Sequence, residues 1–342
     1  MMMRFEVVVL CSALIAVVDA FRKKSPPVAT PYAAEKSFVP IEAVMGGVFI
    51  GVASGVSMIT SSRVAGCSGA LKSLVLADTD GWKVGFVAGL TFAGASMGQL
   101  LPALLEDPPA ASIVLGLGGL AVGTGTSWAN GCTSGHGLAG LSRLSFRSLV
   151  AVPTFMAVAI TTRTMQTGLS FSLLPVVSHT KYDIEILMLA IAFAALLALV
   201  LFFAPAGLRN SLLGLWSGGC FGTGLVVGGM ARPSAVTGAL SPSALDLTLW
   251  ALFMTALGVT FLLYRAAEAS GIKAARSGPQ GAAQIDNGLV VGSGLFGVGW
   301  ALTGLCPGPL AVGLGAQPTA PGMLLVLATF AIGVKLTTVV KL

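Results

Sequence analysis

Apolar stretches of about 17 to 21 residues recur along the 342-residue chain, separated by proline, charged or polar clusters. As a helix, each stretch is long enough to cross roughly 30 Å of hydrocarbon. The pattern predicts about nine transmembrane helices, at residues 41–60, 82–101, 111–129, 147–163, 184–204, 210–230, 246–264, 288–304 and 322–340. We therefore expect an all-α polytopic membrane protein.

Two short motifs occur twice, in the same order and about 170 residues apart. RVAGCSGAL at 63–71 matches RPSAVTGAL at 232–240, and GTSWANGCTSG at 125–135 matches GVGWALTGLCPG at 297–308. Five predicted spans separate the first copy from the second, and an odd shift reverses the orientation in the membrane. The sequence thus predicts two inverted pseudo-symmetric repeats, 41–183 and 206–342, joined by a connector helix at 184–205.

The four glycine-rich motif segments are too short to cross a bilayer and too apolar to be ordinary loops. Non-helical backbone at membrane depth is tolerated only where protein or a water-filled cavity surrounds it. We therefore interpret these segments as re-entrant. In transporters built from inverted repeats, such broken helices meet at the substrate site near the midplane.

The N-terminus has the pattern of a targeting segment. Residues 1–20 resemble a signal peptide, with an apolar stretch behind Arg4 and a small-residue ending that fits cleavage after Ala20. The basic lead at 21–40 is similar to a transit peptide, and Phe21 at its start resembles the bipartite presequence of algal complex plastids. A secretory signal before a disordered lead and an uncleaved first helix are the alternatives.

Composition and charge agree with a membrane protein. The chain is 55% hydrophobic and only 9% charged, whereas an ordinary soluble domain is roughly a quarter charged. A net charge of +6 is typical of loops that obey the positive-inside rule and does not indicate a nucleic-acid partner. Most Lys and Arg residues fall in loops on the side of the C-terminus, which predicts the C-terminus inside and the mature N-terminus outside. The sequence does not distinguish a plasma membrane from a plastid envelope.

The five cysteines are odd in number, widely spaced and without a CxxC pair, so no disulfide framework is expected. They are Cys11, Cys67, Cys132, Cys220 and Cys306. With only two histidines in the chain, no metal site is predicted, and no cofactor is implied.

The segments NGCTSGHGL at 130–138, GLCPGP at 304–309 and RVAGCSGALKSL at 63–74 resemble the YeeE/YedE family of sulfur-compound transporters. The resemblance covers roughly residues 41–340. It implies an hourglass-shaped helical protein that takes up thiosulfate, in bacteria often beside a soluble sulfur-carrier or sulfurtransferase protein. It also implies that Cys67, Cys132 and Cys306 contact the anion along a central path. Val236 replaces cysteine in the fourth, symmetry-related position.

Thiols suit such a path because they are weak donors and weak acceptors that a soft anion can contact and leave. Removing the hydration of a dianion costs tens of kcal/mol in an apolar medium, so other groups must contribute. We expect the N-termini of the re-entrant segments, with Thr133 and Ser134, to do so. His136 either lines the same vestibule or packs against the backbone. Arg63 and Arg232 either attract the anion or mark loop ends, and Cys220 is expected to be a packing residue.

Two further functions remain open. A membrane sulfurtransferase would form a persulfide on Cys132, activated by a base such as His136. A passive channel for a small solute would also fit re-entrant segments, although it leaves the cysteines unexplained. A non-enzymatic transporter of thiosulfate or a closely related sulfur compound is the leading prediction.

Overall fold

The computed structural model describes residues 39–106, 111–168, 170–173, 183–272 and 285–340. The predicted signal peptide and nearly all of the predicted basic lead lie outside these ranges. Within them the secondary structure is helical, apart from an isolated bridge between Leu173 and Leu245.

A long helix coincides with each of the nine predicted apolar windows. These helices are α2 (Pro40–Ser61), α4 (Gly81–Leu100), α5 (Ile113–Ala129), α6 (Phe146–Thr167), α7 (Asp183–Phe203), α8 (Ala206–Val227), α10 (Thr248–Ala269), α11 (Asn287–Thr303) and α13 (Pro321–Val339). Two single 3-10 turns, η2 (Pro102–Leu104) and η4 (Pro242–Ala244), lie in connections.

Five helical segments among the described residues are long and apolar enough to cross a membrane. They are α2, α6, α10, α13 and the continuous stretch Asn287–Ala316, which contains α11 and its short successor. The protein is thus a polytopic helical membrane protein, and the count of nine spans stays a prediction.

Four of the long helices end at a sharp break followed by a short helix. Ser62, Asn130 and Gly304 end α2, α5 and α11 in the left-handed region, with φ of 53°, 59° and 67°, and Gly229 follows α8 with φ of 79°. An extended residue then starts each short helix, namely α3 (Cys67–Val75), the π-helical η3 (Thr133–Gly140), α9 (Pro233–Ala239) and α12 (Pro307–Ala316). At 1.5 Å per residue these helices span about 10 to 15 Å, at most half of the hydrocarbon thickness. They coincide with the four motif segments singled out in the sequence.

Glycines let the long helices approach closely. Gly85 and Gly89 of α4 face α8, while Gly214 and Gly218 of α8 face α4, and a Cβ at any of the four would overlap backbone atoms of the other helix. Both helices therefore carry small residues four positions apart at their contact, a pattern that favours close packing in lipid.

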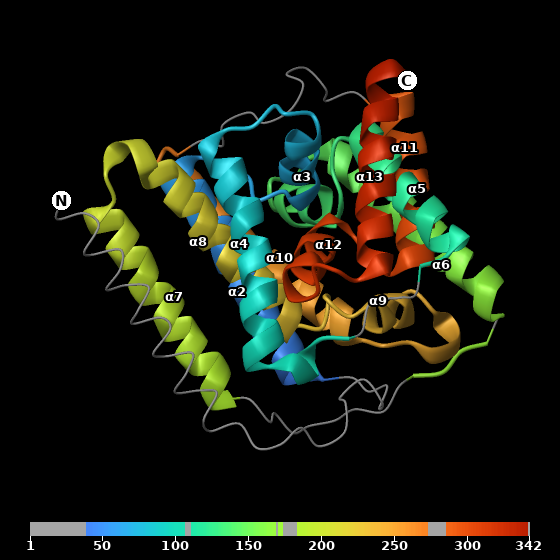
Figure 1. Cartoon of the computed structure of the whole chain (residues 1–342), viewed down its shortest axis with the longest axis horizontal. Coiled ribbons are helices and arrows are strands. Elements are labelled where there is room, and N and C mark those ends of the chain that lie inside the picture. The colour runs from blue at the N-terminus through green and yellow to red at the C-terminus, as the bar shows by residue number, and fades with distance from the viewer. Residues whose placement is uncertain (1–38, 107–110, 169, 174–182, 273–284, 341–342) are drawn as a thin grey trace.

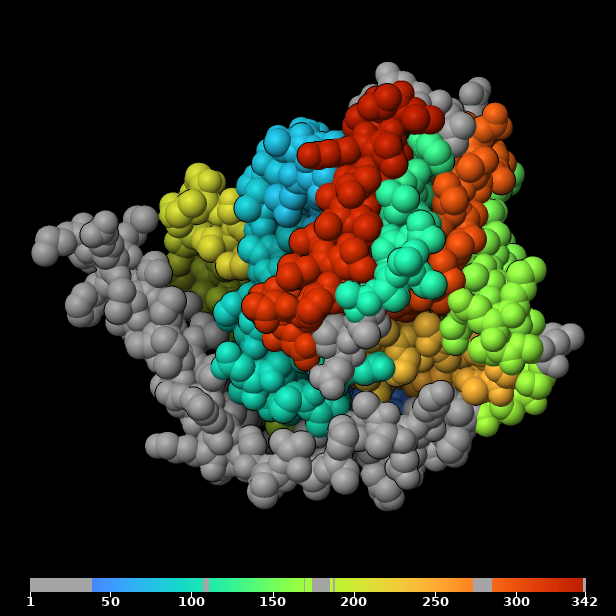
Figure 2. All heavy atoms as spheres, turned by 45° about the vertical axis from the view of Figure 1, so that its right-hand side comes forward, coloured from blue at the N-terminus to red at the C-terminus, as the bar shows by residue number. Residues whose placement is uncertain are grey.

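The packing of the first half is repeated in the second. The contact between α4 and α8 corresponds to the contact between α10 and α2. In the same way, the contact between α5 and α13 corresponds to that between α11 and α6, and the contact between α12 and α4 to that between η3 and α10. Figure 2 shows the C-terminal α12 and α13, in red, covering one face between α4 and α5 of the first half. The two halves therefore form one body.

Helix α7, which occupies the predicted connector, lies at the edge of this body beside α8 (Figure 1). The indole N–H of Trp216 on α8 donates a hydrogen bond of 2.8 Å to the carbonyl of Phe193 on α7. The Phe193 ring also makes an edge contact with Phe49 of α2, with 6.1 Å between centroids.

Candidate functional site

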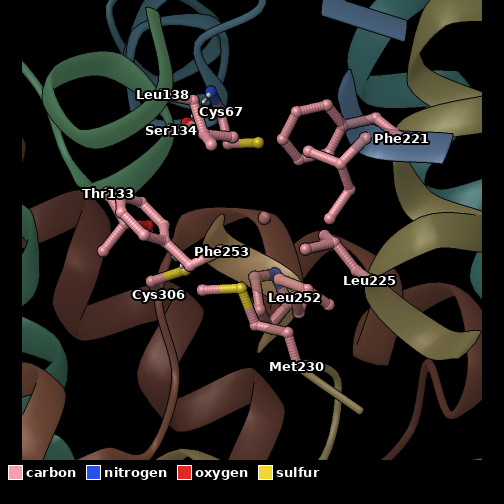
Figure 3. Close-up of a pocket in the computed structure, with 13 residues that line it drawn as sticks. Cys67, Thr133, Ser134, Leu138, Phe221, Leu225, Met230, Leu252, Phe253 and Cys306 are labelled. Atoms are coloured by element: carbon pink, nitrogen blue, oxygen red, sulfur yellow. Dashed lines mark hydrogen bonds between the residues drawn. The ribbon is translucent and has the colours of Figure 1, made fainter. Parts of the chain in front are cut away.

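Three of the short helices begin at one small internal cavity (Figure 3). Their first residues form one side of it, namely Cys67 of α3, Thr133 and Ser134 of η3, and Cys306, Gly308 and Pro309 of α12. The remaining lining is apolar and comes mainly from α2, α8 and α10. The breaks in the long helices thus place backbone N–H groups and small polar side chains in the interior of the protein.

Cys67 is the first residue of α3, and its side chain is 3% exposed. Its backbone N–H donates a hydrogen bond of 3.1 Å to Oγ of Ser134. On the other side, a Cβ at Gly308 would lie 3.0 Å from Sγ of Cys67. The cysteine therefore lies between the starts of η3 and α12.

Cys306 caps the N-terminus of α12 and lines the cavity. Its sulfur lies 3.8 Å from the hydroxyl oxygen of Thr133. In Figure 3 Cys67 enters from above and Cys306 from below left. Two of the three predicted pathway cysteines thus share one cavity.

Cys132 lies just outside this lining. It is the N-cap of η3 and is 1% exposed, and its sulfur lies 3.3 Å from Oγ of Ser134. Ser134, which lines the cavity, therefore contacts both Cys132 and Cys67.

His136 packs behind the cavity wall. Its Nδ1 lies 3.0 Å from the hydroxyl of Ser148, and its Nε2 lies 3.0 Å from the carbonyl oxygen of Ala129. With a carbonyl as acceptor, Nε2 carries the proton of a neutral ring and Nδ1 accepts from the serine. Both ring nitrogens are engaged, so His136 joins η3 to α5 and α6.

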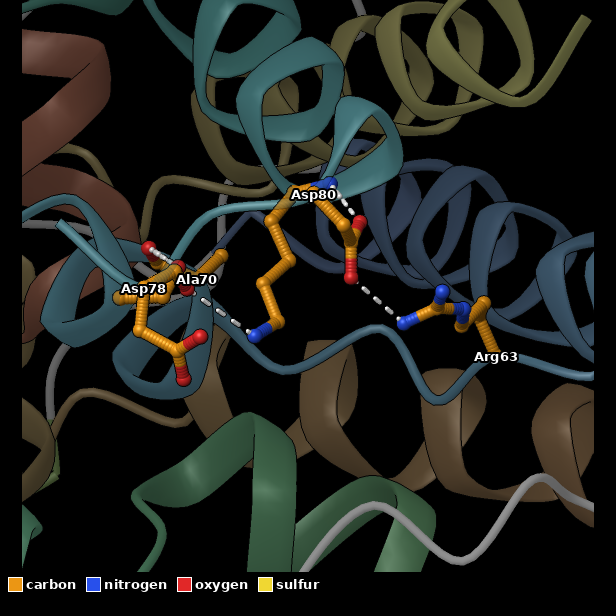
Figure 4. Close-up of polar contacts among 6 residues, drawn as sticks. Arg63, Ala70, Asp78 and Asp80 are labelled. Atoms are coloured by element: carbon orange, nitrogen blue, oxygen red, sulfur yellow. Dashed lines mark hydrogen bonds and ion pairs between the residues drawn. The ribbon is translucent and has the colours of Figure 1, made fainter.

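The two arginines of the motifs do not line the cavity. Arg63 forms an ion pair of 2.8 Å with Asp80, which caps α4 (Figure 4). Because these residues flank α3, the pair joins the two ends of the segment that carries Cys67. Arg232 is buried, with its guanidinium against Gly229.

Two opposing effects act on the pKa of the Asp80 carboxyl group. Partial burial by itself would raise the pKa of its carboxyl group. The N–H of Lys83 and the guanidinium of Arg63 outweigh that effect and hold the pKa of Asp80 below its usual range. The carboxylate is therefore charged at neutral pH.

The remaining cysteine of the described residues packs elsewhere. Cys220 on α8 is 1% exposed, and its thiol donates to the carbonyl of Phe49 at 3.4 Å. Val236, in the cysteine position of the fourth motif, is completely buried in α9 and is not part of the cavity lining.

Sequence reasoning missed the apolar part of the lining. Its members include Ile50, Phe221, Leu225, Met230 and Leu252. Such residues look like ordinary packing residues in a span, and only the proximity of Met230 to the Arg232 motif gave a local signal.

No Lys, Arg, Asp or Glu is among the described residues that line the cavity. In the same part of the chain, no group of three or more His, Cys, Asp or Glu side chains is placed to hold a metal ion.

Comparison with known proteins agrees with the predicted family. Residues 2–161 match the family described as "Sulphur transport", and residues 208–341 match a family of unknown function, DUF6691. A protein of Xylella fastidiosa strain 9a5c named "Probable transporter" is 32% identical over 127 residues, which cover 90% of that protein and 35% of this chain. The chain belongs to the YeeE/YedE sulphur transport family.

Other similar proteins carry the same name. A "Probable transporter" of Xylella fastidiosa strain Temecula1 is 32% identical over 127 residues, again 90% of its length and 35% of this chain. A further match in that strain is 58% identical over 36 residues, 24% of the relative and 9% of this chain. Because 90% of the first relative corresponds to 35% of this chain, that relative is less than half as long as this chain.

Proposed function

We propose that the protein is a membrane transporter that takes up thiosulfate, or a closely related sulfur anion, through the cavity between α3, η3 and α12. Membership of the sulphur transport family and relatives named probable transporters support transport of a sulfur compound. The observation that carries the thiol-lined path is that Cys67 and Cys306, from opposite halves of the chain, line one cavity.

The start of each short helix supplies the partial positive charge that the thiols lack. A helix N-terminus carries about half a positive charge and unpaired N–H groups, and therefore favours an anion. Three such termini, together with the hydroxyls of Thr133 and Ser134, would replace part of the water around the anion. Each contact is weak, so the anion is not held permanently. Arg63 is engaged with Asp80 and would act on the anion only from a distance, as would Arg232.

We place Cys132 one contact behind the wall, at Ser134, and His136 behind η3. In this proposal the anion meets Cys67 and Cys306 directly in the conformation described. Cys132 reaches it when the Ser134 hydroxyl moves aside.

Inverted repeats are part of the proposal. The equivalent packing of the two halves supports them, because the contacts of α4 with α8, α5 with α13 and α4 with α12 correspond to those of α10 with α2, α11 with α6 and α10 with η3. Opening one side of the cavity and then the other would follow from rocking one repeat against the other. We further propose that the C-terminus lies inside, in a plasma membrane or plastid envelope, and that a soluble sulfur-carrier or sulfurtransferase protein accepts the substrate there.

The contacts of His136 weaken the case for a persulfide on Cys132. Neither ring nitrogen points to the thiol, because one contacts Ser148 and the other contacts Ala129. A sulfurtransferase would leave covalent sulfur on the protein, whereas a transporter or channel would deliver unchanged substrate.

Uptake of sulfur-labelled thiosulfate into proteoliposomes tests the proposal. The variants Cys67→Ala, Cys132→Ala and Cys306→Ala should lose most of the uptake, whereas the matched control Cys220→Ala should keep it. Folded protein in the vesicles is quantified for each variant. Absence of uptake in the parent protein, or equal uptake in all four variants, would contradict the proposal.

A further inference from the structure

The cavity has two walls of different chemistry. We define the polar wall as Cys67, Thr133, Ser134, Cys306 and Gly308, at the starts of three short helices, and the apolar Leu138 and Phe253 line the cavity among them. We define the apolar wall as Ile50, Phe221, Leu225, Met230 and Leu252. In Figure 3 Cys67 and Ser134 lie above, Thr133 to the left and Cys306 below left, while Phe221 and Leu225 lie to the right and Leu252 and Met230 below, with the Met230 thioether pointing towards Cys306. No side chain of the apolar wall can donate a conventional hydrogen bond.

Met230 shows why the walls differ. Three of the four helix breaks bring the start of a short helix to the cavity, whereas the break between α8 and α9 brings Met230. Val236, the counterpart of Cys67, is buried inside α9, and the N–H of Ser234 in the first turn of α9 donates to the carboxylate of Glu106 at 2.9 Å. The fourth segment therefore presents a polarisable thioether and no donor to the cavity.

We propose that the apolar wall, which includes Met230, receives the terminal sulfur of thiosulfate and thereby excludes sulfate. Sulfate and thiosulfate have the same tetrahedral shape, but sulfate has an oxygen at every corner. In any orientation one sulfate oxygen would face the apolar wall without a donor, and an unpaired buried oxygen is costly. The terminal sulfur of thiosulfate is large and polarisable, so it is suited to contact with a thioether and hydrocarbon.

In this orientation the three oxygens of thiosulfate face the polar wall, where the helix N-termini and the Thr133 and Ser134 hydroxyls lie. Cys67 and Cys306 flank the anion. The inference rests on the proposed function, since it concerns how the same cavity selects its substrate. It assigns selectivity to residues other than the cysteines.

Selectivity is measured as the ratio of thiosulfate uptake to sulfate uptake in proteoliposomes, with excess sulfate also tested as a competitor. Met230→Gln places amide donors in the apolar wall at similar side-chain length. We expect this ratio to fall by about tenfold or more, because a donor now meets the fourth sulfate oxygen. Met230→Leu keeps the wall apolar and should retain the discrimination against sulfate, whatever its transport rate.

Leu225→Asn is a second, nearly isosteric change that places a donor in the same wall, so the test does not depend on the folding of one variant. It should also lower the ratio. If the Gln and Asn variants both transport thiosulfate with the parental ratio, or if Met230→Leu loses selectivity as far as Met230→Gln, the inference is wrong. Failure of the parent to transport thiosulfate would instead overturn the proposed function, so the two failures are distinguishable.

Discussion

The backbone N–H of Cys67 donates a hydrogen bond of 3.1 Å to Oγ of Ser134. The same oxygen lies 3.3 Å from the sulfur of Cys132. One hydroxyl group therefore joins the start of α3 to the start of η3 and brings together two cysteines that are far apart in the sequence.

Removing this hydroxyl should loosen both helix starts. Ser134→Ala leaves the first N–H of α3 without its partner, and we expect a loss of about 1 kcal/mol of stability together with lower thiosulfate uptake. The matched control is Ser73→Ala, which removes only a bond within α3 to the carbonyl of Ala70. Thermal unfolding in detergent and uptake in proteoliposomes are measured for both. Equal uptake in the two variants would contradict a role for Ser134 at the cavity.

The size of the cavity depends on the absence of a side chain at position 308. A Cβ at Gly308 would lie 3.0 Å from Sγ of Cys67 and 3.1 Å from Leu225 Cδ1, and would fill space between the two walls. We expect Gly308→Ala to lower thiosulfate uptake and Gly308→Val to abolish it, because the densely packed interior has little room to adjust. Gly69→Ala on α3 is the control, since a Cβ there meets no atom within 4 Å. Unchanged uptake in Gly308→Val would place the path elsewhere.

The Arg63–Asp80 pair should contribute stability that depends on pH. Asp80 accepts the N–H of Lys83 at 3.0 Å and pairs with Arg63 at 2.8 Å. Asp80→Asn keeps a cap but loses the ion pair, and should cost less than about 1 kcal/mol because both side chains are about one-third exposed. Asp80→Ala also loses the cap and should cost about 0.5 to 2 kcal/mol more.

The sign of the pH dependence follows from the lowered pKa of Asp80. A carboxyl group whose pKa is lower in the folded state stabilises the protein above its unfolded pKa, and this contribution is lost as the pH falls through the folded pKa. The difference in unfolding temperature between the parent and Asp80→Asn should therefore be greatest near neutral pH and shrink below about pH 4. A difference that grows on acidification would contradict the ion pair's role.

The contact between α4 and α8 should not tolerate even one added methyl group. A Cβ at Gly218 would overlap the backbone carbonyl of Phe86, so Gly218→Ala should force the helices apart at a cost of about 1 to 3 kcal/mol. Gly258→Ala, in the middle of α10, is the control because a Cβ there meets no atom within 4 Å. If the two variants unfold at the same temperature, the contact between α4 and α8 is not tight.

The helix bounds could be predicted from the sequence because hydropathy and helix-ending residues are local properties. The window at 82–101 became α4 at Gly81–Leu100, and the window at 322–340 became α13 at Pro321–Val339. The predicted window at 210–230 lies too far towards the C-terminus, because α8 ends at Val227 before the turn that contains Gly229. A glycine at or beside each break, with a cysteine after three of them and a proline after two, likewise indicated the four segments that fold as short helices.

The sequence by itself thus determined a helical membrane protein with four broken helices and cysteines close to three of the breaks. Only the tertiary structure decided that Cys67, Cys306 and Met230 line one cavity and that Cys132, outside this lining, contacts Ser134. Residue spacing determines where a short helix starts. The direction of its first side chains depends on packing against segments more than 60 positions away, such as η3 against α3, and no local pattern contains that information.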